Sequence, residues 1–308
     1  MSSRSRQSSR ILAYIAATVA VTLWGMSYIW TDKIINQGVS IFYFIFVRIF
    51  LAGVIMFLFN TTYGRIKRIQ KRDLPKFLLL AFFEPFTYFI CETFGIKLTG
   101  SPTISAVVIA TIPIFSTGAG VLFFKEKITP VNILGIIVSL TGILMVAAAK
   151  GAAGENFIWG IMLLLIAVLS TVGHSSLTKS LVGIYSSQII VMYQFLIGAV
   201  YLLPLFLWKG HSDFNAEIYF SSEVWYPLIC LTVLCSSLAF SLWVSSIKSL
   251  GVAKSSIFSA MIPVAAALVA WILGHELLTT RQWAGIAIST AGVVLSQYTA
   301  KKQVKTRV

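Results

Sequence analysis

The stretch SAVVIATIPIFSTGAGVLFFKEKITPVNILGIIVSLTGIL, residues 105–144, aligns without a gap with SSIFSAMIPVAAALVAWILGHELLTTRQWAGIAISTAGVV, residues 255–294. The two copies are identical at ten of 40 positions. The shared residues with the strongest effect on the backbone are Pro113 and Pro263, Glu126 and Glu276, Thr129 and Thr279, Gly135 and Gly285, and Gly142 and Gly292. Each copy predicts an apolar helix with a central proline, a turn containing glutamate, and a second apolar helix rich in small residues. The chain therefore contains a duplicated membrane unit, an architecture typical of secondary transporters.

The composition excludes an ordinary soluble domain. Hydrophobic residues make up 57% of the 308 residues, and charged residues only 11%. Apolar runs of about 20 residues, the length that crosses ~30 Å of hydrocarbon, recur along the whole chain. We predict an all-α integral membrane protein with ten transmembrane helices, at residues 11–31, 41–60, 77–98, 103–124, 131–149, 157–177, 187–208, 225–247, 253–273 and 282–299.

The excess of basic residues has a membrane explanation. With the N-terminus in the cytoplasm, 18 of the 24 Lys and Arg residues fall on the cytoplasmic side, five on the outer side, and one within a span. This is the positive-inside rule, and it places both termini in the cytoplasm. Positive charge then sets the orientation, and we expect no nucleic-acid partner. The first apolar stretch is too long for a signal peptide, so we expect a retained first span.

The number of spans determines how the two copies are related. Each half has five spans, an odd number, so the second half is inverted relative to the first. We predict one repeat at residues 1–150 and a second at residues 151–308 that includes a basic cytoplasmic tail. A centre between inverted halves can open to either side when the halves exchange conformations. A monomer then has a complete pathway, and the small-residue faces also permit a homodimer.

These features resemble a known family. The ten spans, the inverted halves and the repeated Pro…Glu-x-x-Thr…Gly…Gly pattern are similar to the EamA-domain members of the drug/metabolite transporter superfamily. The resemblance covers nearly the whole chain, and the paired turns at Glu126 and Glu276 are its most specific element. It implies transport of metabolites, often amino acids and commonly outward, across the bacterial inner membrane. It leaves the substrate open.

Three charged residues within the spans are candidate site residues, because each costs about 2.5–3.5 kcal/mol to insert. Arg48 and Glu92 lie at a similar depth below the outer boundary, so the two can pair. Glu84, Tyr88 and Glu92 are spaced i, i+4, i+8 and share one helix face. Two interpretations remain open. The arginine and the outer glutamate form an ion pair that locks two helices, or they bind a substrate carboxylate and amino group in a cavity.

Two residues are candidates for proton coupling. Glu84 precedes Pro85, which removes a backbone donor and loosens the helix beside the carboxylate. His174 lies near the cytoplasmic end of the sixth span, where it can relay protons. The alternative for the histidine is a hydrated or helix-bonded side chain.

The second half places different residues at the corresponding positions. Gln194 corresponds to the arginine of the second span and Trp243 to the outer glutamate of the third. We predict that both line the cavity, together with the aromatic residues Trp24 and Tyr28. The alternative for membrane aromatics is an interfacial belt or contact with lipid.

The residues shared by the two copies have structural interpretations. Pro113 and Pro263 are predicted in the middle of their spans, as gating hinges or as static kinks. Glu126 and Glu276 lie at helix ends, where a carboxylate or the nearby threonine can cap the next helix. The glycines and serines form small-residue faces for close packing within the protein or in a dimer.

Other chemistries find no support in the sequence. The three cysteines lie within predicted helices, so we expect neither a disulfide nor a metal site, and no cofactor. No HExxH, GxSxG or paired intramembrane aspartates occur, so we do not expect an enzyme. The leading hypothesis is a secondary transporter that exports an amino acid or related small metabolite across the cytoplasmic membrane by alternating access, with protons as candidate coupling ions. The alternatives are uptake or exchange of a more anionic solute, and an intramembrane lipid-handling protein, either a flippase or a lipid-modifying enzyme.

Overall fold

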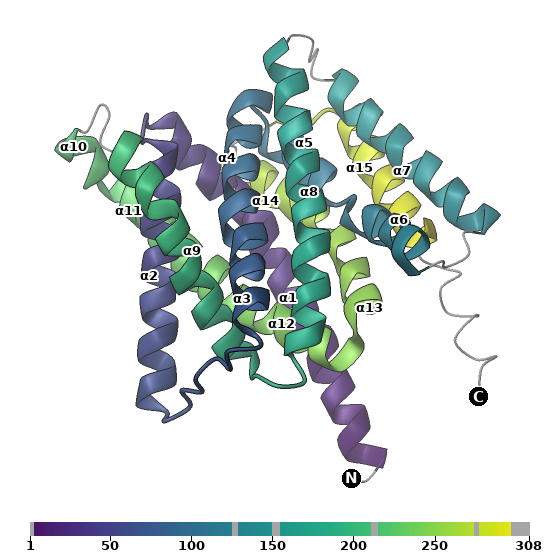
Figure 1. Cartoon of the computed structure of the whole chain (residues 1–308). Coiled ribbons are helices and arrows are strands. Elements are labelled where there is room, and N and C mark those ends of the chain that lie inside the picture. Colours follow the sequence, from purple (N-terminus) through teal and green to yellow (C-terminus); the bar gives the residue numbers. More distant parts are fainter. Residues whose placement is uncertain (1–2, 125–128, 150–154, 211–214, 274–276, 297–308) are drawn as a thin grey trace.

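The computed structural model describes residues 3–124, 129–149, 155–210, 215–273 and 277–296. Within these ranges the chain is helical and has no strand (Figure 1). The first half contains α1 (Ser3–Asn36), α2 (Ile41–Thr62), α3 (Leu74–Ala81), η1 (Phe82–Thr87), α4 (Tyr88–Thr99), α5 (Pro102–Ile109), α6 (Ile112–Phe124) and α7 (Pro130–Ala149). The second half contains α8 (Glu155–Leu181), α9 (Ser187–Lys209), α10 (Ala216–Tyr219), α11 (Ser222–Cys230), η2 (Leu231–Leu238), α12 (Ala239–Leu250), α13 (Val252–Ser256), η3 (Ile257–Met261), α14 (Ile262–Ile272) and α15 (Thr280–Ser296).

The helices are those of a multi-pass membrane protein. Among the described residues, seven helical stretches are long and apolar enough to cross a membrane: Ile11–Asn36, Ile41–Thr62, Leu74–Thr99, Glu155–Leu181, Ser187–Lys209, Ser222–Leu250 and Lys254–Ile272. The three other predicted spans coincide with shorter helices. Pro102–Gly118 and Pro130–Val146 are apolar, and α15 has 17 residues. Ten spans therefore stay a prediction of the sequence.

Several spans are interrupted, and the interruptions occur at matching places in the two halves. The wider π-type turns η1 and η2 break the predicted third and eighth spans. Within η1 the backbone of Glu84 leaves the helical region, at φ −135° and ψ 122°. Such turns often mark functional sites, because they open the regular ladder of backbone hydrogen bonds.

The fourth and ninth predicted spans are each broken next to a proline. Pro113 is the second residue of α6, and Pro263 is the second residue of α14, directly after the 3-10 turn η3. Both prolines therefore lie inside their predicted spans, as expected, and each marks a break between two helical segments. Since proline has no N–H to continue the ladder, the chain ends one helix and begins another, and each proline occupies a first turn where that donor is not needed.

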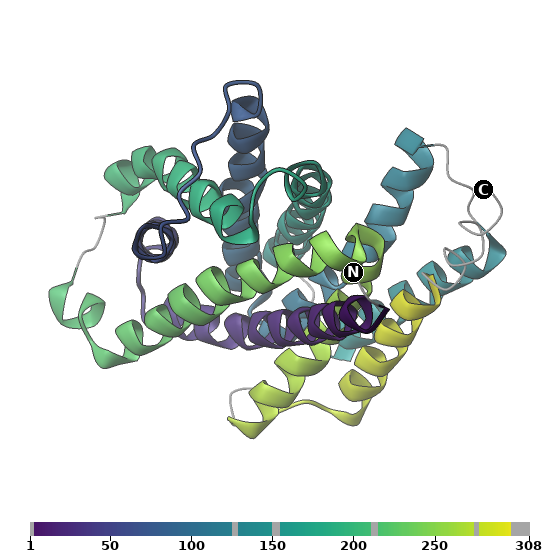
Figure 2. The same ribbon diagram turned by 90° about the horizontal axis from the view of Figure 1, so that it is seen from below.

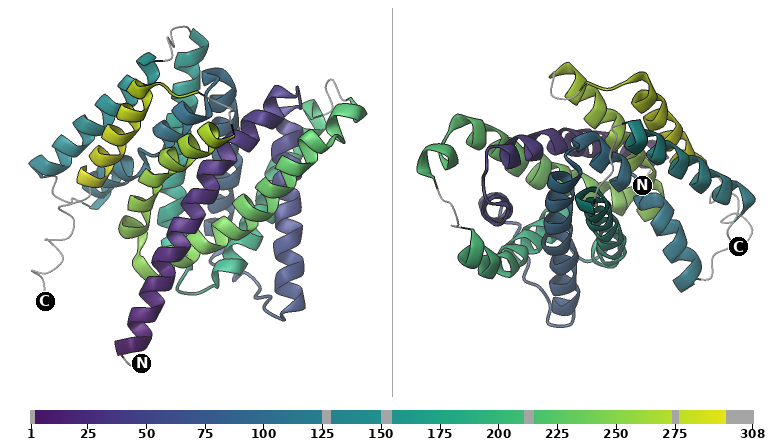
Figure 3. Two further views of the ribbon diagram at one scale, coloured as in Figure 1. Left: turned by 180° about the vertical axis from the view of Figure 1, so that it is seen from behind. Right: turned by 90° about the horizontal axis from the view of Figure 1, so that it is seen from above.

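The packing of helices relates the two halves. Helices α2 and α9 pack together, as do α7 and α15 (Figures 1 and 3). Helix α4 packs against α8, and α12 runs alongside α1 (Figure 2). Helices α2 and α9 have the same place in the two repeats, and so do α7 and α15. Helices α4 and α8 correspond to α12 and α1, so the α4–α8 pair has its counterpart in the α12–α1 pair.

Helices α7 and α15 meet through the small residues of the repeated segment. The hydroxyls of Ser139 and Ser289 lie 3.4 Å apart. A Cβ atom added to Gly142 would lie 2.5 Å from the carbonyl oxygen of Gly285 and 2.7 Å from Cα of Ser289. The small-residue faces therefore serve packing within the protein, which is one of the two roles that the sequence left open.

The same two helices begin with matching caps. The backbone N–H of Thr129 donates to Oδ1 of Asn132, whose own N–H donates back to the threonine hydroxyl. Thr279 and Gln282 repeat this arrangement at the start of α15. Each pair is a capping box, which satisfies two backbone donors at once. Glu126 and Glu276 lie outside the described residues.

Two connections join at the end of the molecule where α1 begins. The 63–73 loop and the α8–α9 connection both lie there (Figure 1). Tyr185 donates its hydroxyl to Oδ2 of Asp73, over 3.1 Å, and accepts the backbone N–H of Gln70. Burial by itself would raise the pKa of Asp73, but hydrogen bonds from Lys76 and from the tyrosine outweigh it and lower the pKa. The two loops are thus tied together on the predicted cytoplasmic side.

Gly142→Ala should lower the free energy of unfolding by about 1–3 kcal/mol, because its Cβ would press on the backbone of α15. SDS titration in mixed micelles measures this change. Gly118→Ala is the matched control, since nothing lies within 4 Å of a Cβ at that position. Equal stability of the two variants would contradict close packing of α7 against α15.

Candidate functional site

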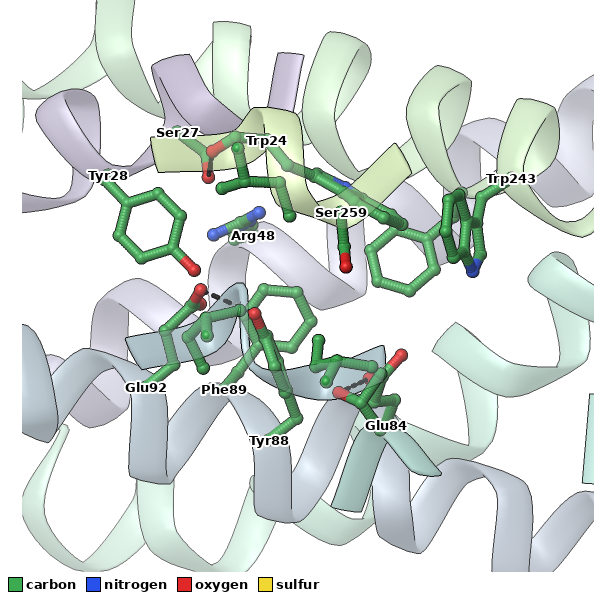
Figure 4. A pocket seen from close by; sticks show the side chains of 15 residues that line it. Trp24, Ser27, Tyr28, Arg48, Glu84, Tyr88, Phe89, Glu92, Trp243 and Ser259 are labelled. Atoms are coloured by element: carbon green, nitrogen blue, oxygen red, sulfur yellow. Dashed lines mark hydrogen bonds between the residues drawn. The ribbon is translucent and has the colours of Figure 1, made fainter. Parts of the chain in front are cut away.

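A cavity lies among α1, α2, α4, α8 and α12 and is lined by residues of both halves (Figure 4). Its polar lining consists of Ser27, Tyr28, Arg48, Glu84, Tyr88, Glu92, Thr171 and Ser259. Its apolar lining consists of Trp24, Phe89, Ile109, Ile112, Phe240, Trp243 and Ile262. The cavity has a volume of about 40 Å³.

The broken spans form part of the cavity wall. Glu84 lies in the π-type turn η1, and Ser259 lies in the 3-10 turn η3. Ile109 and Ile112 flank the break between α5 and α6. Irregular backbone within membrane-spanning segments is tolerated where it lines a cavity or is buried in protein. The interruptions and the cavity are therefore one feature of the fold.

Arg48 is buried on the cavity wall, with 2% of its surface exposed. Its Nε donates to the hydroxyl of Ser236 over 3.0 Å, and its guanidinium carbon lies 4.4 Å from the centre of the Phe89 ring. The terminal guanidinium nitrogens have no protein acceptor among the described residues. Their hydrogen-bond donors therefore remain unused by the described protein groups, and a carboxylate is the group that such a fork binds best.

The predicted ion pair between Arg48 and Glu92 is not formed. No nitrogen of the arginine lies within 4.0 Å of the Glu92 carboxylate in the described structure. The physical reason is that Ser236 and the Phe89 ring hold the guanidinium in another direction. The interpretation of these two residues as a direct lock between helices is therefore wrong.

Glu92 has its own partners. Its Oε1 accepts the hydroxyl of Tyr88 over 2.8 Å. Figure 4 shows the hydroxyl of Tyr28 pointing toward the same carboxylate. Glu92 is 5% exposed, and it lines the cavity. An ionised carboxylate at this position can accept hydrogen bonds from an ammonium group.

An aromatic wall adjoins these charges. The indole N–H of Trp24 donates to the carbonyl oxygen of Cys235 over 3.0 Å, so this ring is fixed. Its ring centre lies 5.2 Å from that of Trp243 and 5.1 Å from that of Phe240. The three rings present apolar faces to the cavity, which suit the carbon chain of a ligand or, through their π-systems, a cation.

Glu84 occupies the other end of the polar lining. Thr171 donates its hydroxyl to Oε1 of Glu84 over 2.5 Å, and Nδ1 of His174 lies 3.1 Å from Oε2. The imidazole is 1% exposed, so the alternative of a hydrated histidine at the interface is wrong. Its position on α8 lies directly behind the glutamate because α8 packs against η1.

Gln194 lies away from the cavity wall, in contrast to the prediction. Its side chain is fully buried, and its Oε1 lies 3.1 Å from Nε2 of His174. Helix α9 packs against α2 and η1, so this amide meets the histidine behind Glu84. Ser236, Phe89 and Thr171 were missed from the sequence, where a serine, a phenylalanine or a threonine in an apolar span gives no signal.

The chain matches the model of the EamA-like transporter family over residues 11–148 and again over residues 158–298. It belongs to the EamA-like transporter family. The family of this chain is that of drug/metabolite transporters, as the resemblance implied.

Relatives of this EamA-like chain are named as transporters. It is 25% identical over 291 residues to "Uncharacterized transporter YetK" of Bacillus subtilis, covering 92% of this chain and 86% of the relative. It is 29% identical over 231 residues to "Probable terminal-alkyne amino-acid exporter" of Streptantibioticus cattleyicolor, covering 75% of each. A solved crystal structure shares the fold, with a TM-score of 0.71, 14% identity and coverage of 95% of this chain and 99% of the other.

Thr171→Val should lower the free energy of unfolding by about 1–3 kcal/mol, because it removes the donor to a buried carboxylate. Thr22→Val is the matched control, since Thr22 is exposed and its hydroxyl bonds only one turn back, to Thr18. The control should stay within about 0.5 kcal/mol of the wild type in SDS titration. An equal effect of both substitutions would contradict the contact with Glu84.

Proposed function

We propose that this EamA-like chain is a secondary transporter that moves an amino acid or a related small metabolite across the cytoplasmic membrane by alternating access. Export is the proposed direction. The substrate binds in the cavity that residues of both halves line, and its chemical groups contact the matching groups of the cavity wall. Its partners are this small solute and the lipid bilayer, and one chain provides a complete pathway, as a monomer or within a homodimer.

The observation that carries the proposal is the arrangement of Arg48 and Glu92. Both line one cavity, yet they do not pair with each other. In the described part of the chain, only Nε of Arg48 donates to a protein side chain, to Ser236, so its terminal nitrogens can donate to a ligand. Oε1 of Glu92 accepts from Tyr88, and Oε2 can accept from a ligand. A ligand with a carboxylate and an ammonium group on adjacent atoms satisfies both. Arg48 binds its carboxylate, and Glu92 binds its amino group.

The relatives support the substrate class. The Streptantibioticus cattleyicolor protein is named as a probable amino-acid exporter, and its match covers 75% of this chain. Within the cavity, Trp24, Tyr28, Tyr88 and Trp243 provide the surface for the substrate's carbon chain. An anionic solute fits less well, because the cavity wall carries one arginine against two glutamates. The aromatic residues are thus proposed to bind substrate rather than lipid.

Alternating access follows from the duplicated sequence. The proposed arrangement is ten spans in two inverted repeats with both termini in the cytoplasm, and the matching packing pairs of the two halves support the repeats. The start of α1, the 63–73 loop and the α8–α9 and α12–α13 connections share one end of the molecule, as this topology requires (Figure 1). Pro113 and Pro263 begin the second part of the broken spans at the cavity, where we propose they act as hinges.

The test is exchange in proteoliposomes that contain the full chain and are preloaded with one radiolabelled amino acid at a time. We expect saturable exchange for one class of amino acid. Arg48→Gln and Glu92→Gln should each lower the apparent affinity about 10- to 100-fold, the cost of a charged hydrogen bond. Initial rates over a range of substrate concentrations measure this change.

Matched controls separate the cavity from the net charge of the protein. Arg68→Gln and Glu217→Gln make the same chemical changes at exposed positions and should leave exchange as in the wild type. If no amino acid exchanges, the proposed function is wrong, and lipids become the next solutes to test. If exchange is unaffected by either cavity substitution, the proposed site is wrong.

A further inference from the structure

We propose that the transported solute is an amino acid with a second amine, and that this amine and a proton held between Glu84 and His174 replace each other in the cavity. The proposal rests on the proposed function and names its substrate class and coupling ion. Arg48 and Glu92 balance each other and are matched by the carboxylate and α-amino group of a substrate, which leaves Glu84 as a second carboxylate.

Glu84 is poised for a positive partner. It lines the cavity but is only 4% exposed, and a buried charge without compensation is costly. Thr171 satisfies one of its oxygens. Glu84 and Glu92 are eight residues apart in sequence, and Figure 4 shows them on opposite sides of the cavity that both line. A diamino acid held by its α-amino group at Glu92 extends its carbon chain along this wall and brings the second amine to Glu84.

The surface between the two carboxylates suits such a chain. Tyr88 lies between them in sequence and also lines the cavity. The rings of Trp24, Phe240 and Trp243 form the facing wall. Methylene groups pack on these rings, and an ammonium group near their faces gains cation–π attraction. The cavity thus has charged groups at both ends and an apolar middle.

His174 provides the alternative partner for Glu84. Its Nδ1 lies 3.1 Å from Oε2, although the two atoms are not aligned for a regular hydrogen bond. Two acceptor atoms at this distance repel each other, so a proton between them stabilises the contact. When the second amine is absent, a proton shared by Oε2 and Nδ1 therefore removes the uncompensated charge.

Gln194 is the positioning residue for this histidine. Its Oε1 can only accept, so Nε2 of the imidazole carries the hydrogen in their 3.1 Å contact. That tautomer turns the lone pair of Nδ1 toward Glu84, where it can take up a proton. Thr178, buried one turn along α8, lies 3.5 Å from the same Nε2. The Nε2 of Gln194 has no partner among the described atoms, so the amide is held chiefly by the histidine.

Among the described residues, the other titratable or charged groups around Glu84 and His174 belong to α1, α2, α4 and η2. They are Tyr28, Arg48, Tyr88, Glu92 and Cys235. Arg48 and Glu92 are assigned to the two ends of the amino-acid group. The phenols and the thiol stay neutral near pH 7. Glu84 with His174 is therefore the group that can change its charge when the substrate enters or leaves.

The exchange is balanced in charge. When a substrate of charge +1 leaves the cavity, Glu84 takes one proton from the solution on that side, and the proton is shared with Nδ1 of His174. When the next substrate enters from the opposite side, its second amine displaces this proton into the solution there. One positive charge moves each way in a cycle, so transport is antiport without net movement of charge.

The experiment compares L-lysine with L-norleucine, which has the same carbon chain without the second amine, in proteoliposomes with the full chain. We expect lysine to exchange with an apparent affinity at least about 10-fold higher than norleucine. A gradient of one pH unit should drive lysine to a concentration ratio of up to about tenfold. Because no net charge moves, this ratio should not change when potassium and valinomycin set the membrane potential.

Three substitutions test the roles of Glu84, His174 and Gln194 in lysine selectivity and proton exchange. Glu84→Gln should remove the preference for lysine while norleucine exchange persists, which also shows that the variant is folded. His174→Gln and Gln194→Leu should keep lysine–lysine exchange but lose the accumulation of lysine that a pH gradient drives. Gln188→Leu is the matched control on α9 and should behave as the wild type, since its side chain is half-buried and lies off the cavity wall.

The outcomes separate this inference from the proposed function. Norleucine exchange equal to that of lysine in the wild type would overturn the diamino-acid class while leaving amino-acid transport in place. Lysine accumulation that follows the membrane potential and ignores the pH gradient would overturn the proton exchange. Undiminished pH-driven accumulation in His174→Gln would overturn the role of the histidine. Absence of exchange for every amino acid would refute the proposed function itself.

Discussion

The free-energy cost of a charge inside a membrane constrains this structure more than any other interaction. Three charged side chains lie in one buried cavity, and each has a neutral partner that orients it: Ser236 for Arg48, Tyr88 for Glu92 and Thr171 for Glu84. None of the three is neutralised by another within 4.0 Å in the described structure. A cavity that orients charges without pairing them is preorganised for a ligand with complementary charges.

The irregular backbone serves this arrangement. In the third span, the turn η1 contains Glu84, which lines the cavity next to α8. The breaks beside Pro113 and Pro263 bring the ends of shorter helices to the same place. Elsewhere the spans are regular and pack closely, most of all where α7 meets α15 through glycine and serine. The fold thus combines a tightly packed end with an interrupted centre.

Patterns along the chain were enough to predict the helices, the repeated segment and a cavity-facing group made of Glu84, Tyr88 and Glu92. The spacing argument assumed a regular helix, yet the three residues share the cavity even though η1 adds a wider turn between the first two. Partners across helices were not predictable in the same way. Arg48 was expected beside Glu92, but its direction depends on the rotamer that Phe89 and Ser236 permit.

The contact of Glu84 with His174 shows the same limit. Each residue was identified singly as a candidate for proton coupling, while their 3.1 Å approach depends on how α8 packs against η1. Gln194 was expected in the cavity because it corresponds to Arg48 in the second repeat. Its side chain instead contacts His174, because corresponding residues of two repeats have different neighbours. Sequence periodicity locates a residue on its own helix, and packing between helices decides what it contacts.

Alternating access of the cavity is the central claim, and accessibility of one wall position to a thiol reagent tests it most directly. Ser259→Cys, in a background without Cys91, Cys230 and Cys235, would be exposed to a membrane-impermeant cationic methanethiosulfonate from one side of oriented vesicles at a time. We expect modification from either side, and protection from modification on both sides by transported substrate. Modification from one side only, with or without substrate, would contradict alternating access of the cavity.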